Sequence, residues 1–164
     1  MDSIVQLILG VILGGIASYL FPLAVDYLLI NKTKQKILGV WVSSFKPKII
    51  AADEWVIEEL EITKDFFRGL KFEGKNNSGG FNWVGFGRVK EKRFIVGEWQ
   101  STNPGAYASG VLILTIAARG NFMFGYDAAP DESGTIIYRE FALGKTAQDL
   151  EKAKQLLTSD TNKK

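Results

Sequence analysis

Neither cysteine nor histidine occurs in this chain of 164 residues. Their absence excludes nucleophilic sites that pair serine or cysteine with histidine, and it excludes the usual zinc sites. A chain without cysteine is also typical of a reducing compartment. A carboxylate pair remains conceivable, but the acidic cluster Glu58, Glu59 and Glu61 falls in a strand pattern and is interpreted as a solvated strand face. We therefore expect a protein that is not an enzyme and holds no metal or cofactor.

Lysine and arginine are absent before Lys32, where the chain instead has an apolar run from Ser3 to Ile30. The only formal charge within this run is Asp26. A helix needs about 20 apolar residues to cross a bilayer core, so the run can cross once but not twice. A cleaved signal peptide would have a basic start and a shorter apolar part, and a soluble helix would have a polar face. The sequence therefore predicts a single transmembrane helix over residues 1–31.

Three lysines, Lys32, Lys34 and Lys36, follow the apolar run directly. Positively charged flanks stay on the cytoplasmic side of a membrane. This flank therefore predicts a cytoplasmic C-terminal domain, joined to the helix by a basic juxtamembrane linker over residues 32–37.

Small residues recur at a spacing of four within the apolar run, at Gly10, Gly14 and Ser18. Such a spacing lets two helix backbones approach closely in lipid. The three residues either form a self-association face or reflect the ordinary glycine content of membrane helices.

The remainder of the chain, about 130 residues, is long enough for one domain with a hydrophobic core. It contains 20 basic and 16 acidic residues, a formal net charge of +4, since only Asp2 and Asp26 lie outside it. This mild basicity permits anionic ligands or lipid head groups, and it does not call for a nucleic acid polymer as partner.

Hydrophobic residues alternate with period two from Leu38 onward, which is typical of strands. Turn residues separate the alternating segments, including an expected tight hairpin at Lys64-Asp65. The expected strands are residues 38–45, 54–63, 66–73, 81–90, 93–100, 110–118, 121–127 and 135–143. Strands joined mainly by hairpins form an antiparallel meander, and closing it into a barrel removes the exposed edges.

A short helix is expected after the last strand. Thr146 suits the N-cap, Asp149 lies three residues later, and Leu150, Ala153 and Leu157 share one helical face. We expect this helix to cover the surface or an open end of the barrel. The domain then spans residues 38–158, and residues 159–164 form a disordered tail. The predicted fold class is mainly β: one transmembrane helix, an eight-stranded antiparallel barrel and a C-terminal helix.

Any chemistry of such a domain must come from the barrel lumen or its mouth. An inward Arg139 would need an acceptor, either an anionic ligand or an internal glutamate such as Glu98; an outward Arg139 would need none. Tryptophans could stack a base or simply fill the core. The candidate ligand-binding residues are Trp83, Arg88, Trp99, Tyr107, Tyr138 and Arg139.

The order of parts is similar to that of a known family. An apolar segment, a basic flank and a barrel opening with Leu38-Gly39-Val40-Trp41 resemble the transmembrane β-barrel effectors of bacterial cyclic-oligonucleotide antiphage systems (CBASS). The resemblance implies that the barrel binds a cyclic dinucleotide, forms a homo-oligomer and disrupts the bacterial inner membrane, which causes abortive infection. The chain departs from the family in having one apolar span rather than two. The alternative is a membrane-anchored, lipocalin-like carrier or sensor of a small apolar ligand.

Overall fold

The computed structural model of the protein describes residues 18, 21, 25, 28, 30–46, 54–76, 81–131 and 133–161. Within these residues, no helix combines the length and the apolar character needed to cross a bilayer. Most of the run over 3–30 lies outside them, as do Gly10 and Gly14 of the expected self-association face. Ser18, the third residue of that face, is helical and exposed.

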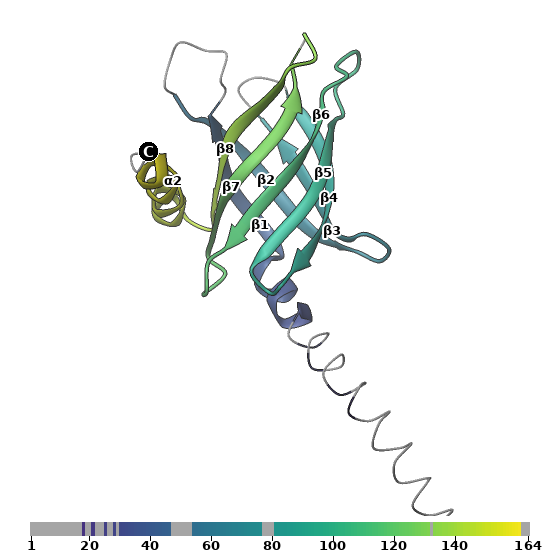
Figure 1. Ribbon diagram of the computed structural model, residues 1–164, viewed down its shortest axis with the longest axis vertical. Coiled ribbons are helices and arrows are strands. Elements are labelled where there is room, and N and C mark those ends of the chain that lie inside the picture. Colours follow the sequence, from purple (N-terminus) through teal and green to yellow (C-terminus); the bar gives the residue numbers. More distant parts are fainter. Residues whose placement is uncertain are drawn as a thin grey trace, which may run out of the picture.

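Eight strands form a closed antiparallel barrel, in which each strand pairs with its neighbours in sequence and β8 closes onto β1 (Figure 1). The strands are β1 (Gly39–Lys46), β2 (Val56–Asp65), β3 (Gly69–Lys75), β4 (Asn82–Lys90), β5 (Phe94–Ser101), β6 (Ser109–Ile116), β7 (Phe122–Pro130) and β8 (Ile136–Gly144). The eight strands and the closed barrel predicted from the sequence are confirmed, with strand ends that shift by three residues or fewer.

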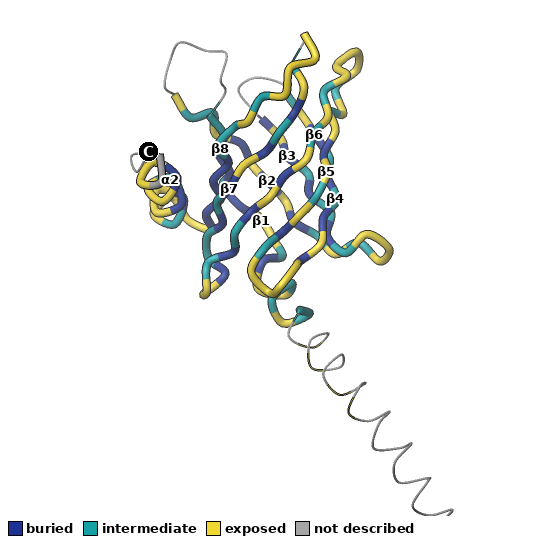
Figure 2. The backbone as a smooth tube through the Cα atoms, viewed as in Figure 1, coloured by how far each residue is buried: buried dark blue, intermediate teal, exposed yellow. Residues whose placement is uncertain are grey.

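Alternation along each strand builds the core. In β4, Trp83 and Val89 point inward and are buried, whereas Arg88 and Lys90 are exposed on the outer face. This two-residue period follows from the pleat of a β-strand, which sends successive side chains to opposite faces. Buried and exposed residues therefore alternate along the strands, and the turns are mostly exposed (Figure 2).

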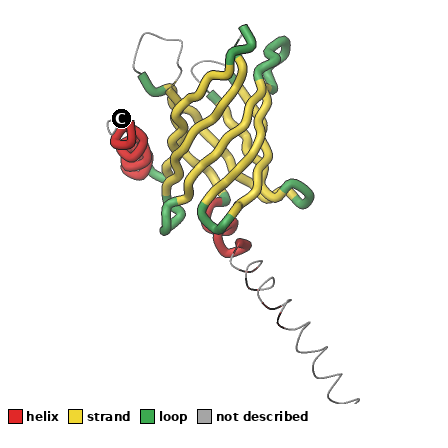
Figure 3. Tube along the Cα trace, in the orientation of Figure 1, coloured by secondary structure: helices red, strands yellow, loops and turns green. Residues whose placement is uncertain are grey.

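The two ends of the barrel differ (Figure 3). At one end, here called the proximal end, the chain enters as a helical segment over residues 30–37, which includes the expected juxtamembrane linker, residues 32–37. Ile37 and Trp41 are fully buried there, and the Trp41 indole N–H donates to the Ile37 carbonyl at 2.9 Å. The opposite, distal end carries the connections β1–β2, β3–β4, β5–β6 and β7–β8.

The hairpin between β2 and β3 differs from the sequence prediction. β2 continues through Asp65, and the turn consists of Phe66, Phe67 and Arg68 rather than Lys64-Asp65. The Asp65 carboxylate holds the turn by accepting the backbone N–H groups of Phe67 and Arg68 at 2.9 and 2.6 Å. Aromatic residues favour strands, which is why the prediction assigned both phenylalanines to the next strand.

Helix α2 (Ala147–Thr161) packs on the outer side of β7, β8 and β1, not over an end of the barrel (Figure 1). The expected N-cap is confirmed, because Thr146 Oγ1 accepts the Asp149 backbone N–H at 3.2 Å. Its apolar face packs against Ala142 of β8. The helix continues to Thr161, past the start of the expected tail at residue 159.

Candidate ligand-binding site

A small cavity lies inside the distal half of the barrel. Its volume is about 20 Å³, room for about one water molecule. The lining residues are Phe45, Glu58, Phe81, Trp83, Trp99, Leu112, Asp127, Arg139 and Phe141. The walls are thus aromatic, with one cation and two carboxyl groups among them.

The aromatic walls form a connected cluster of edge-to-face contacts. The ring centroid of Trp99 lies 6.3 Å from those of both Phe81 and Trp83, and Trp83 lies 6.1 Å from Phe141. These separations are within the range in which aromatic pairs attract. The guanidinium of Arg139 sits 5.1 Å from the Trp99 ring centre, which places the cation against an aromatic face.

Arg139 is held by Asp127, its register partner on the adjacent strand β7. Its Nε donates to Asp127 Oδ1 at 2.9 Å, and its Nη2 donates to Oδ2. Burial raises the pKa of Asp127, while the hydrogen bond and charge of Arg139 oppose that rise. The pair is therefore a bidentate ion pair in which the carboxylate is stabilised chiefly by Arg139.

Glu58 is the second carboxyl group of the cavity and is only 3% exposed. It accepts the Ser43 hydroxyl at 2.7 Å and the Trp83 indole N–H at 3.0 Å. Burial raises the pKa of Glu58, and these two hydrogen bonds oppose the rise. The charge on Glu58 is therefore a cost to the barrel that its donors only partly offset.

We predict that Glu58→Gln leaves the barrel at least as stable at pH 7. The folded pKa lies above the ordinary value of 4.5, so ionised Glu58 destabilises the barrel at neutral pH. This cost fades as the pH falls through the folded pKa toward 4.5. Glutamine can still accept from Trp83 and can donate to the Ser43 hydroxyl oxygen.

Urea unfolding at pH 7 and pH 5 checks this prediction. The wild type should gain more stability on acidification than Glu58→Gln, and the gap between the two should shrink at pH 5. Glu61→Gln, exposed on the outer face of the same strand, is the control. A Glu58→Gln barrel clearly weaker than this control at pH 7 would contradict a destabilising charge.

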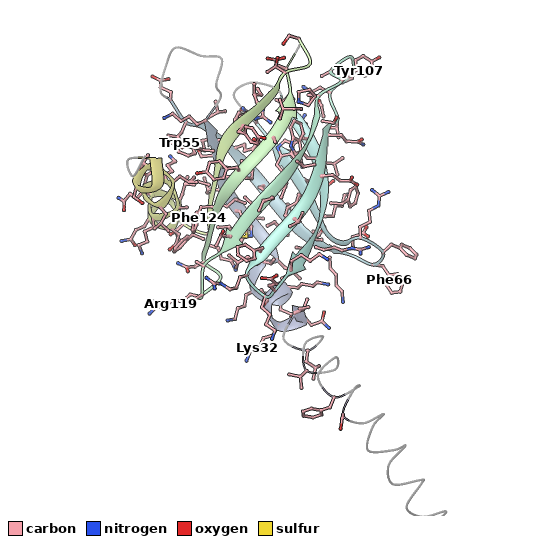
Figure 4. All side chains as sticks on the ribbon, viewed as in Figure 1. Lys32, Trp55, Phe66, Tyr107, Arg119 and Phe124 are labelled. Atoms are coloured by element: carbon pink, nitrogen blue, oxygen red, sulfur yellow. The ribbon has the colours of Figure 1, made fainter. Side chains whose placement is uncertain are left out.

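The structure brings together three of the six residues expected from the sequence. Trp83, Trp99 and Arg139 line the cavity, and Arg139 points inward, one of the two orientations considered. Arg88, Tyr107 and Tyr138 are exposed outside the lumen. Tyr107 is 99% exposed in the β5–β6 connection (Figure 4). Tyr138 is 66% exposed on the outer face of β8.

Two residues that line the cavity were not predicted from the sequence. Glu58 was interpreted as part of a solvated face, and Asp127 was not singled out, yet both are buried in the lumen. Glu98, the suggested partner of Arg139, is exposed on the outside instead. The alternation along the strand could have placed Glu58 correctly. Glu58 lies two and four residues before the apolar Leu60 and Ile62 and therefore on the same, inward face of the strand.

One polar group of the cavity has no partner among the residues that the structure describes. The indole Nε1 of Trp99 is buried and makes no hydrogen bond there. A buried donor without an acceptor is costly. An acceptor brought by a ligand would satisfy this group.

No protein-family model and no curated protein sequence matches this chain. Among solved structures, a redesigned β-barrel named mFAP1, bound to DFHBI, is similar with a TM-score of 0.54 and 11% identity, covering 69% of this chain and 98% of that one. A second redesigned barrel, b11L5F_LGL, has a TM-score of 0.53 and 10% identity, covering 70% and 95%. At such identities the likeness shows the fold alone.

Proposed function

We propose that the protein is a membrane-anchored antiphage effector whose barrel senses a cyclic dinucleotide at its distal cavity. The observation that carries the proposal is Arg139, an inward cation set against the aromatic face of Trp99. A cyclic dinucleotide presents phosphates and flat bases, which call for these two kinds of group. The resemblance to CBASS effectors supports the same ligand class.

Binding requires the cavity to open, because about 20 Å³ is too small for a nucleotide base. In this proposal the cavity opens where the ion pair between Arg139 and Asp127 separates. Arg139 exchanges the carboxylate for a ligand phosphate, and Asp127, whose pKa burial already raises, takes up a proton as its partner leaves. The Trp99 indole N–H, without a partner in the described residues, gains an acceptor from the ligand. Ligand binding is thereby coupled to proton uptake.

The apolar run over 3–30 supplies the membrane anchor in this proposal. Gly10, Gly14 and Ser18 then form the face along which anchors associate once the barrel is occupied. Assembly of these helices in the bacterial inner membrane disrupts the bilayer, with the barrel on the cytoplasmic side.

A membrane-anchored, lipocalin-like carrier or sensor of a small apolar ligand is the second candidate. The observation in its favour is that Asp127 already neutralises Arg139, which leaves the other walls mainly aromatic. The redesigned barrel mFAP1 has DFHBI bound, so a barrel of this fold holds a ligand. Unlike the cyclic-dinucleotide effector, this second candidate binds its ligand while Arg139 stays paired with Asp127.

Native mass spectrometry of the full chain in nanodiscs separates the two candidates. Against a panel of cyclic dinucleotides and fatty acids, we expect a cyclic dinucleotide to bind. Trp99→Leu should weaken this binding about tenfold, since stacking on an aromatic contributes roughly 1–3 kcal/mol per base. Tyr138→Leu, on the outer face beside Arg139, should leave it unchanged. A barrel that retains only a fatty acid would support the carrier, and one that binds neither would overturn both.

A further inference from the structure

Two phenylalanines project from the proximal end of the barrel at the tip of the β2–β3 hairpin. Phe66 is 90% exposed (Figure 4). Phe67 is 83% exposed, and the two rings lie edge to face with their centroids 5.1 Å apart. The Asp65 carboxylate fixes the turn that presents them. Water is a poor environment for two adjacent aromatic rings, so this tip is suited to contact with an apolar phase.

The charges around these phenylalanines are almost all positive. The proximal end, defined as residues 30–37, 64–69, 90–93, 117–121 and 145, contains ten basic and two acidic residues, a formal net charge of +8. The basic residues are Lys32, Lys34, Lys36, Lys64, Arg68, Lys90, Lys92, Arg93, Arg119 and Lys145. The described residues of the four distal connections, 46, 54–55, 75–76, 81, 101–109, 130–131 and 133–136, contain two lysines and two acidic residues, a net charge of 0. Charge is therefore polarised along the barrel axis.

The helical segment over residues 30–37 is fixed to this same end. The Lys145 ammonium donates to the Lys36 carbonyl at 2.7 Å and lies 5.3 Å from the Trp41 ring centre. A groove of about 290 Å³ runs beside the segment, and Lys36, Lys92 and Arg93 are among its lining residues. The basic side chains of the segment and of the neighbouring turns thus lie at the same end of the barrel.

We propose that the proximal end is a docking surface for an anionic lipid bilayer. Phe66 and Phe67 insert at the level of the lipid head groups, and the surrounding lysines and arginines lie against lipid phosphates. A second copy of the chain is a poorer partner, because it would bring the same concentration of positive charge to the interface. The inference extends the membrane anchoring proposed above and does not depend on what the lumen binds.

The absence of cysteine allows a site-specific test on the full chain. Ala118→Cys places one environment-sensitive label on the exposed β6–β7 turn of the proximal end and removes no charge. Tyr107→Cys places the same label at the distal end as the matched control. Each labelled chain is reconstituted into phosphatidylcholine vesicles that contain brominated lipid, which quenches a label near the bilayer. The vesicles are prepared with and without phosphatidylserine.

Docking predicts quenching of the label at residue 118, but not at 107, in vesicles that contain phosphatidylserine. Adding Phe66→Ser and Phe67→Ser should lower the ratio of docked to undocked barrel about tenfold or more. Omitting phosphatidylserine or raising the salt concentration should also lower it.

Three outcomes would overturn the inference. Labels at 118 and 107 that respond alike in floating vesicles would refute docking and leave the membrane anchor intact. A chain that does not float with either kind of vesicle would refute both the docking and the anchor. The chain could also self-associate in the absence of vesicles. If Phe66→Ser and Phe67→Ser abolish that self-association, the surface binds a second copy of the chain instead of a bilayer.

Discussion

Asp127→Ala is expected to lower the free energy of unfolding by about 3–5 kcal/mol. The substitution removes the bidentate partner of Arg139 and leaves a guanidinium inside an aromatic cavity. Arginine keeps its charge, so the substitution leaves a cation without its bidentate partner.

The reverse substitution should cost less. Arg139→Met leaves Asp127 unpaired, but burial raises the pKa of this carboxyl group, so it can take up a proton. The double substitution Asp127→Ala with Arg139→Met should recover much of the loss, because a pair replaced by apolar groups leaves no buried charge. Urea unfolding followed by tryptophan fluorescence measures all three variants. Additive losses in the double variant would show that the pair is not coupled. Equal losses for the two single variants would contradict the claim that Asp127 relieves its charge by taking up a proton.

Trp41→Ala is expected to destabilise the protein by a similar amount, about 3–5 kcal/mol. Trp41 is fully buried at the proximal end and binds the Ile37 carbonyl, which joins the helical segment to the barrel. Removing the indole opens a cavity there and loosens the contact between the two parts.

Trp41→Phe separates the packing from the hydrogen bond. It keeps an aromatic ring but removes the donor to the Ile37 carbonyl together with part of the indole, so it should cost about 0.5–1.5 kcal/mol plus a packing term. Val40→Ala, at an exposed position beside it, is the control. A Trp41→Phe variant as weak as Trp41→Ala would mean that the hydrogen bond, and not the buried ring, holds this end together.

The barrel could be predicted because its strands and turns are encoded by residues that are close together in the sequence. Strand periodicity depends on neighbouring residues, and the turn residues between segments marked the hairpins. Trp83, Trp99 and Arg139 could be placed in the lumen as one of the options because parity fixes the face of a strand. The position of α2 on the side of the barrel was left open, since its apolar face fits either a side or an end.

The polar network could not be predicted because it depends on contacts between strands. Asp127 meets Arg139 only through the register of β7 against β8. Glu58 accepts a hydrogen bond from Trp83, which lies 25 residues away in the sequence. The residues next to Glu58 in the sequence do not indicate this buried donor. Phe66 and Phe67 were assigned to a strand because their preference for strands is strong, whereas the neighbouring aspartate determines the turn.

Fluorine NMR of the full chain with 5-fluorotryptophan tests the central claim most directly, because the four tryptophans lie in different places. Trp83 and Trp99 line the distal cavity, Trp41 is buried at the proximal end, and Trp55 packs beside α2. If the cavity is the receptor for a cyclic dinucleotide, titration should shift the Trp83 and Trp99 signals and leave those of Trp41 and Trp55 in place. Unchanged Trp83 and Trp99 signals at saturating ligand, or shifts confined to Trp41 and Trp55, would contradict it.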